Sequence, residues 1–446
     1  MDLGHPGHYY VVAAIGSEFF FFDGERWVHW QTGTFPSLAT SALDKKTLTI
    51  AVNANLAAYH GTQIFAGYGF SDQDLLTRSN YALVHTLGPR YDLGVCYHAY
   101  GADFLRTAFV TIYHQPQVRD TVRQQLQGMA DAGATVISTR LWFVRDPSES
   151  DFGETFRATF PISPQEIANL RQYVTDVATI VGTNGQRLRL DLSMLYLGWA
   201  DYTTGSPETG LGFYRNMSSS EFTRRWEACL DGILSAATGV NRPDGVPVVD
   251  SVYFDGEVMI GAKQNQDWFL QTHYPTFVSR TRNAGFNPTL YFNINEPAAN
   301  VLDTAWRDAL YADLTGYRPL FWVYRSLLFM KQQGLPLPDR IDFSLYITDL
   351  GSISVDSALF SSLVQRVLKG CEAALTPLGA PRAYGIAETF YFADASRRQA
   401  YGRALAAEGR RNDQLQLMTF WTTPDSGGAG VHASYPFSIA DYLPGA

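Results

Sequence analysis

Two glutamates end short apolar runs that resemble each other. Glu388 ends the run in RAYGIAETFYF, and Glu257 ends the run in DSVYFDGEVM. Enzymes that cleave glycosidic bonds usually need two carboxyl groups: one donates a proton to the leaving oxygen, and the other attacks the sugar or activates water. The two glutamates therefore predict this chemistry, provided that the fold brings them to facing walls of one site.

The two runs belong to a series of about eight strand-like segments. Helix-like segments, most of which end in glycine, separate them. Alternating strands and helices predict a parallel sheet covered by helices, and about eight such units fit a (β/α)8 TIM barrel with enlarged loops. An open doubly wound sheet is the alternative, but it usually carries a phosphate-binding turn that the sequence lacks. The strand-like segments start near Tyr91, Ala134, Leu188, Asp250, Pro288, Arg340, Arg382 and Leu415.

The first part of the chain has a different pattern. Short β-rich runs broken by Gly, Asn and Asp follow one another there without an amphipathic helix between them. We therefore predict an α/β protein with two domains: a small antiparallel β domain over residues 1–88 and a barrel catalytic domain over residues 89–446. Trp27 and Trp30 have odd spacing, so they face opposite sides if their run is a strand. Either ring packs inside the protein or binds glycan.

The active site of such a barrel forms where the strands end. The predicted strand ends carry carboxylates, aromatic rings, amides and one guanidinium, a set that suits a carbohydrate. The strands that end in Glu257 and Glu388 are the fourth and seventh, which face each other across the barrel. Besides these two, we predict substrate contacts from His98, Arg140, Trp142, Tyr196, Trp199, Asp255, Asn293, Asn295, Glu296, Tyr346, Asp349, Tyr391 and Trp421.

The roles of the two glutamates follow from this arrangement. A separation of about 5 Å between the carboxyl groups would support a retaining double displacement. Glu257 is then the acid/base and Glu388 the nucleophile. Arg140 and Tyr346 would keep Glu388 ionised through charge and hydrogen bonding.

This arrangement resembles the clan A glycoside hydrolases, the four-seven barrel superfamily, over about residues 90–425. The resemblance rests on the two glutamates together with Arg140, Tyr346 and Trp421, which match the strand-two Arg, strand-six Tyr and strand-eight Trp of the clan. It implies hydrolysis of an oligo- or polysaccharide.

The sequence departs from the clan at two points. Gly256 stands where the clan usually has Asn before the acid. The clan-like sequence Asn295-Glu296-Pro297 lies on the predicted fifth strand. Shifting the count by one strand would make Glu296 the acid, but no glutamate then stands three strands further on.

Four alternatives stay open. Asp255 would be the nucleophile of a barrel glycosidase, with Glu296 or Asp349 as the acid. Asp255 and Glu257 would instead support substrate-assisted cleavage of N-acetylated sugars. The barrel would bind glycan without turnover, or it would be a lyase or isomerase, a class that the lack of a lysine cluster at the strand ends disfavours.

Composition and motifs disfavour several kinds of partner and cofactor. The net charge is −9 and no block of Lys or Arg appears, which disfavours nucleic acid and anionic membranes as partners. No apolar stretch approaches the roughly 20 residues of a membrane helix, so membrane insertion is not expected. CxxC and HExxH motifs are absent, so we expect no metal or other cofactor.

Cys96, Cys229 and Cys371 are expected to be buried free thiols. The N-terminus lacks a secretory leader, so a secreted, periplasmic or cell-surface location requires that one was removed, and the protein is otherwise cytoplasmic.

Overall fold

The chain folds into two compact units, Met1–Tyr91 and Asp92–Ala446. The computed structural model describes residues 6–15, 18–42, 62–86, 91–97, 109–144, 157–183, 185, 187–195, 218–254, 263–297, 319–338, 340–348, 358–379, 383–389, 405 and 414–421. No helix within these ranges is long and apolar enough to cross a membrane. The three cysteines are buried and form no disulfide, as predicted.

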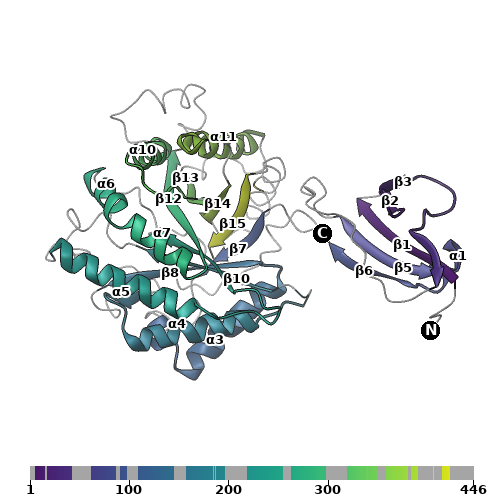
Figure 1. Ribbon diagram of the computed structural model, residues 1–446, viewed down its shortest axis with the longest axis horizontal. Helices are drawn as coiled ribbons and strands as arrows, with labels where there is room; N and C mark the ends of the chain where they lie inside the picture. Colours follow the sequence, from purple (N-terminus) through teal and green to yellow (C-terminus); the bar gives the residue numbers. More distant parts are fainter. Residues whose placement is uncertain are drawn as a thin grey trace. The chain divides into compact units, whose positions relative to one another are not determined.

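The first unit is an antiparallel sheet, which confirms the predicted β domain (Figure 1). Its strand order is β3-β2-β1-β5-β6, and β4 pairs with β1 beside β2. One short helix begins after Ser71, whose side chain accepts a hydrogen bond from the backbone of Asp74. The elements are β1 (Pro6–Ile15), β2 (Glu18–Phe22), β3 (Trp27–Trp30), β4 (Ala39–Ala42), β5 (Gln63–Gly69), α1 (Asp72–Thr77) and β6 (Tyr81–Thr86).

Both faces of this sheet carry apolar clusters. Val11, Phe22 and Ile64 are buried on one face, where Trp27 packs against them. Tyr10 and Phe21 are buried on the other face beneath Leu75 of α1, and Trp30 packs there. The two tryptophans therefore lie on opposite faces, as their odd spacing predicted.

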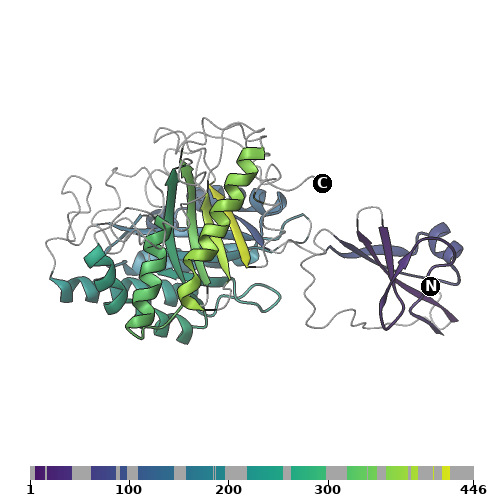
Figure 2. The ribbon, with the colours of Figure 1, turned by 90° about the horizontal axis from the view of Figure 1, so that it is seen from above.

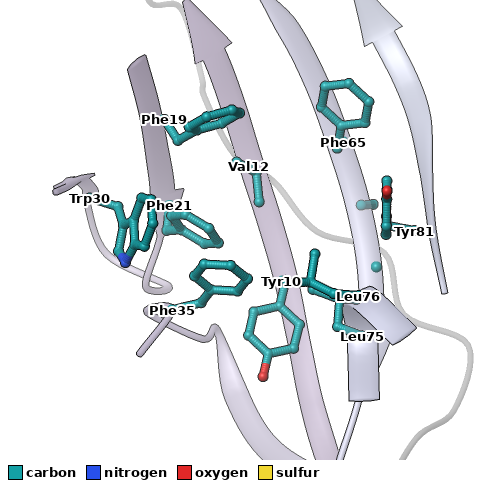
Figure 3. Close-up of a pocket in the computed structure, with 12 residues that line it drawn as sticks. Tyr10, Val12, Phe19, Phe21, Trp30, Phe35, Phe65, Leu75, Leu76 and Tyr81 are labelled. Atoms are coloured by element: carbon teal, nitrogen blue, oxygen red, sulfur yellow. The ribbon is translucent and has the colours of Figure 1, made fainter. Parts of the chain in front are cut away.

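Trp30 lines an apolar cavity of about 280 Å³ on its face of the sheet (Figure 3). Two side chains of the lining use their hydrogen-bond donors within this unit: the Tyr10 hydroxyl donates to Asp72 at 2.9 Å, and Trp30 Nε1 donates to the Gly33 carbonyl at 3.1 Å. A sugar needs hydrogen-bonding groups beside its ring contacts, and these two donors are already used. The cavity is lined by Tyr10, Val12, Phe19, Phe21, Trp30, Phe35, Phe65, Ala66, Gly67, Leu75, Leu76 and Tyr81.

The second unit contains a closed barrel of eight parallel strands, which confirms the predicted fold. Closure comes from the pairing of β15 with β7 and of β8 with β10. Each predicted strand-like segment contains one barrel strand, and a short extra strand, β9 (Arg157–Thr159), pairs with β8. The barrel strands are β7 (Asp92–Cys96), β8 (Val136–Val144), β10 (Arg189–Leu195), β11 (Val249–Phe254), β12 (Asn287–Pro297), β13 (Arg340–Thr348), β14 (Tyr384–Thr389) and β15 (Leu415–Trp421).

Helices cover the outside of the barrel (Figures 1 and 2). α7 packs on β11 and β12, and α10 packs on β12. The predicted capping box at Ser163 is present: Ser163 Oγ accepts from the Glu166 backbone at 3.3 Å, and Glu166 Oε2 accepts from the Ser163 backbone at 2.8 Å. The described helices are α2 (Phe109–Ile112), α3 (Pro116–Asp131), α4 (Pro164–Thr179), α5 (Ser219–Ala237), α6 (Lys263–Thr272), α7 (Tyr274–Asn283), α10 (Pro319–Gln332), α11 (Ala358–Ala374) and the 3-10 turn η6 (Thr376–Leu378).

A buried histidine joins three of these helices. His273 lies between α6 and α7, and its Nε2 is 3.1 Å from the hydroxyl of Thr223 on α5. The rings of Trp226, Trp268 and Phe269 surround it, with centroids within 5.0 Å of its own. Burial among these rings lowers the pKa of His273 from 6.5 to about 4, because the charged form loses its hydration there.

Replacing His273 with phenylalanine should remove the part of the stability loss at acidic pH that protonation of this buried imidazole causes. The unfolded chain binds the proton more tightly than the folded protein, so stability falls as the pH drops through 6.5 toward 4. We expect the wild type to lose about 2–3 kcal/mol more than His273→Phe between pH 7 and pH 4. Urea unfolding of both proteins at the two pH values measures the difference. Equal losses would contradict a neutral buried His273.

Candidate active site

Three side chains from distant parts of the sequence meet inside the barrel. They are Arg140 on β8, Tyr291 on β12 and Glu388 near the C-terminal end of β14. Arg140 and Glu388 are 3% and 2% exposed, and Tyr291 is fully buried. A charge at this depth is stable only with a partner, so their contacts decide whether the site can exist.

Each of the three side chains contacts the other two. The Arg140 guanidinium forms a short ion pair with Glu388 Oε2. The Tyr291 hydroxyl donates to the same oxygen at 2.6 Å. The Arg140 guanidinium carbon lies 4.5 Å from the centre of the Tyr291 ring, within the range of a cation–π interaction. Both donors to Oε2 favour the ionised carboxylate over the neutral acid and fix its orientation.

A break in the strand pairing turns Glu388 into the barrel. Gly385 pairs with Asp342 and Ile386 pairs with Phe343, but Ser344 pairs with Glu388, so the pairing skips Ala387. With regular alternation, Glu388 would share the outward face of Ile386. Arg140 Nη2 donates to the Ala387 carbonyl at 2.9 Å and so binds the skipped residue. An irregularity of this kind is a common way to re-aim a side chain next to an active site.

The structure brings together two of the residues that the sequence indicated. Arg140 contacts Glu388 as expected of a residue that keeps the nucleophile ionised. Tyr291 was missed, although its sequence carries a signal. It precedes Asn293 and Asn295 by two and four residues in PTLYFNINEP, so strand parity alone would have predicted that it shares their face.

The strand count behind the prediction is confirmed. In chain order β11 is the fourth barrel strand, β12 the fifth and β14 the seventh. Glu388 therefore belongs to strand seven, and Asn295-Glu296-Pro297 belongs to strand five. The shifted count that would have made Glu296 the strand-four acid is wrong.

The other predicted site residues fall into two groups. Six of them lie in the C-terminal halves of barrel strands, where the structure describes their backbone: Trp142, Asn293, Asn295, Glu296, Tyr346 and Trp421. Asn293 pairs with Ser344, the residue that also pairs with Glu388, so these strand positions are level with one another. Outside the described residues lie His98, Tyr196, Trp199, Asp255, Glu257, Asp349 and Tyr391.

Two further observations concern metals and charge. Among the described residues, no group of three or more His, Cys, Asp and Glu side chains is placed to hold a metal ion. The interior groups next to Glu388 are a guanidinium and a phenol, which stabilise negative charge. Chemically, the arrangement presents one fixed carboxylate at the C-terminal end of a strand.

Comparisons with known proteins find distant similarities to solved structures. No family model and no curated protein matches the sequence. A solved structure of GH5_18 from Bifidobacterium longum subsp. longum is similar at 12% identity and a TM-score of 0.46, over 74% of this chain and 69% of that one. The exo-beta-1,4-mannosidase Op5Man5 from Opitutaceae bacterium strain TAV5 is similar at 13% identity and 0.44, over 74% and 51%.

A third similar structure is a beta-glycosidase from Pyrococcus horikoshii, at 11% identity and a TM-score of 0.43, over 77% of this chain and 87% of that one. At these identities and TM-scores the likenesses carry no conclusion about activity. The geometry of the site itself therefore carries the evidence for function.

The buried ion pair should show strong coupling in a double-mutant cycle. Arg140→Met alone leaves a buried carboxylate without its counter-charge and should destabilise the protein by about 3–5 kcal/mol. Arg140→Met with Glu388→Gln removes both charges, so the pair of substitutions should cost clearly less than the sum of the single ones.

Urea unfolding of the four proteins measures this coupling. Tyr291→Phe is the matched control, because it removes one hydrogen bond to the same oxygen and leaves both charges; we expect a loss of about 1–2 kcal/mol. Additive effects of the two charge substitutions would show that Arg140 and Glu388 do not form the pair.

Proposed function

We propose that this protein hydrolyses O-glycosidic bonds of an oligo- or polysaccharide by a retaining double displacement. The observation that carries the proposal is the carboxylate of Glu388, which is turned inward at the end of the seventh barrel strand and held through Oε2 by Arg140 and Tyr291. A nucleophile needs to be ionised, oriented and close to the mouth of the barrel, and this group meets each requirement.

In the first step the other oxygen of Glu388 attacks the anomeric carbon. The bond to the leaving oxygen breaks, and that oxygen takes a proton from a carboxylic acid on the opposite wall. Glu257 is the proposed acid, because it follows the end of β11, the fourth strand, by three residues. As the ester bond to the sugar forms, the negative charge of Glu388 decreases. Arg140 and Tyr291 keep the carboxylate in position while this happens.

In the second step water replaces Glu388. Glu257, now ionised, accepts a proton from the water, whose oxygen bonds to the anomeric carbon on the face that the leaving group occupied. The ester bond breaks and Glu388 regains its charge. Two inversions at one carbon give net retention. Arg140 and Tyr291 favour this second step, since they stabilise the returning carboxylate.

The strand-end residues predicted from the sequence complete the proposed site. We propose that Asn293 and Asn295 on β12 and Tyr346 on β13 bind the hydroxyls of a sugar that lies over Glu388. Trp142 and Trp421 would provide ring faces for the C–H side of a sugar. This assignment favours Glu388 over Asp255 as the nucleophile, since two donors already hold its carboxylate.

The stereochemistry of rescue by azide tests both roles. With Glu388→Ala, azide should replace the missing nucleophile and give a glycosyl azide of inverted configuration. With Glu257→Ala, azide should attack the glycosyl-enzyme and give a glycosyl azide of retained configuration. A panel of nitrophenyl glycosides provides substrates that do not depend on the natural sugar, and NMR of the product identifies the anomer.

Each substitution should lower kcat by at least about a thousandfold without azide. Asp255→Asn is the matched control and should retain turnover without azide. If Asp255→Asn instead gives the inverted azide product and Glu388→Ala remains active, Asp255 is the nucleophile. Absence of turnover by the wild type across β-linked polysaccharides and the glycoside panel would point to a glycan-binding barrel.

A further inference from the structure

A second polar cluster lies in the barrel interior, one layer toward the N-terminal ends of the strands. It consists of Asp191 on β10, Tyr253 on β11, and Arg340 and Asp342 on β13, and is called the floor cluster below. Both aspartates are fully buried, and Tyr253 is 1% exposed. Asp342 precedes Ser344, the pairing partner of Glu388, by two residues, so the floor cluster lies beneath the candidate active site.

One phenol in the floor cluster contacts two carboxylates. The Tyr253 hydroxyl lies 2.6 Å from Asp342 Oδ2 and 3.1 Å from Asp191 Oδ2. A phenol has one proton to donate. The shorter contact identifies Asp342 as its acceptor, so the contact between Tyr253 and Asp191 needs a proton from another source.

Arg340 gives Asp191 only a long contact. Its Nη2 forms an ion pair with Asp342 Oδ2 at 3.0 Å and donates to Ser251 Oγ at 3.2 Å, to the Tyr253 oxygen at 3.3 Å and to Asp191 Oδ2 at 3.5 Å. This nitrogen has two protons for four nearby oxygens, and the contact with Asp191 is the longest of the four.

Arg189, the other nearby cation, is also engaged elsewhere. Its Nη1 donates to Asp92 Oδ2 at 2.6 Å, whereas its Nε is 3.8 Å from Asp191 Oδ1, beyond hydrogen-bonding distance. Asp250 Oδ2 lies 3.7 Å from the same Nε. Among the residues that the structure describes, Asp191 Oδ1 has no hydrogen-bond partner. The charged groups around Asp191 are thus two guanidinium groups and three further carboxylates.

We propose that Asp191 is a protonated carboxylic acid in the folded protein under mildly acidic conditions and donates its proton to the Tyr253 oxygen. The resulting chain runs from the Asp191 acid through the Tyr253 hydroxyl to the Asp342 carboxylate, which Arg340 balances. The protons of Asp191 and Tyr253 then each have one acceptor, and the four side chains of the floor cluster together carry no net charge. Burial acts in the same direction, because it raises the pKa of Asp191 from 3.8 to about 6.

This proton makes the floor cluster sensitive to pH. Since the folded protein binds it more tightly than the unfolded chain, the stability that it contributes is fully present below about pH 4 and lost as the pH rises through about 6. The ring of Tyr253 lies 5.7 Å from that of Tyr291, which holds Glu388. The protonated floor cluster thus supports the residues of the candidate site.

Asparagine substitutions at the two aspartates distinguish their protonation states. Asp191→Asn replaces the acid with an amide that also donates to Tyr253, so it should not destabilise the protein at pH 5. Asp342→Asn, at an equally buried position, removes the charge that balances Arg340 and should destabilise the protein at pH 5. Urea unfolding followed by tryptophan fluorescence measures both.

The same measurement over pH 4–7 tests the proton directly. Relative to Asp191→Asn, the folding equilibrium constant of the wild type should fall roughly fiftyfold between pH 4 and pH 7. Equal losses for the two asparagine variants at pH 5, or parallel pH profiles for the wild type and Asp191→Asn, would overturn the proposal.

Infrared spectroscopy of the wild type provides a test that needs no variant to fold. Aspartate labelled with ¹³C should show the carbonyl stretch of a protonated carboxylic acid in the folded protein at pH 5, and this band should disappear as the pH rises above 6. Asp342→Asn should keep the band, and Asp191→Asn should lose it. A folded wild type without the band at pH 5 would overturn the proposal.

Discussion

The buried charge of Glu388 is the constraint on which the rest of the barrel depends. A carboxylate that is 2% exposed requires a counter-charge, and the chain provides it from Arg140, 248 positions earlier in the sequence. The two residues meet only when the barrel closes, because they stand on the second and seventh strands. The same guanidinium donates to the Ala387 carbonyl, where the strand pairing is interrupted, so it stabilises both the charge of Glu388 and the backbone that turns Glu388 inward.

Polar residues fill an interior that barrels usually fill with branched apolar side chains. On β13, Arg340 and Asp342 face the interior, while Ile341 and Phe343 alternate with them and are buried on the other side. The apolar core therefore lies mainly between strands and helices, and charge pairs and hydroxyls occupy much of the described barrel interior. This division explains why each strand reads as an apolar run with polar interruptions.

Local patterns predicted the architecture well and the site in part. Eight apolar runs separated by helices were enough for the barrel, and the strand count placed Arg140 on the second strand and Glu388 on the seventh. Regular alternation gives the wrong face for Glu388, since the skipped pairing at Ala387 depends on contacts with β13 and Arg140 rather than on adjacent residues. Tyr291 and the floor cluster were missed for a related reason. Their partners come from strands far apart in the sequence, and no local spacing records such pairs.

The two interior layers repeat one arrangement. In the candidate active site, Arg140 and the Tyr291 hydroxyl both contact the carboxylate of Glu388. In the floor cluster, Arg340 and the Tyr253 hydroxyl contact the carboxylate of Asp342 in the same way. Both phenols donate at 2.6 Å, and the two tyrosine rings pack against each other. Each layer thus balances one carboxylate with one guanidinium. Asp191 is a third carboxylate beside these two pairs. Its contacts with the two nearby guanidinium groups are long, 3.5 Å to Arg340 and 3.8 Å to Arg189, and the proposed proton neutralises it at that depth.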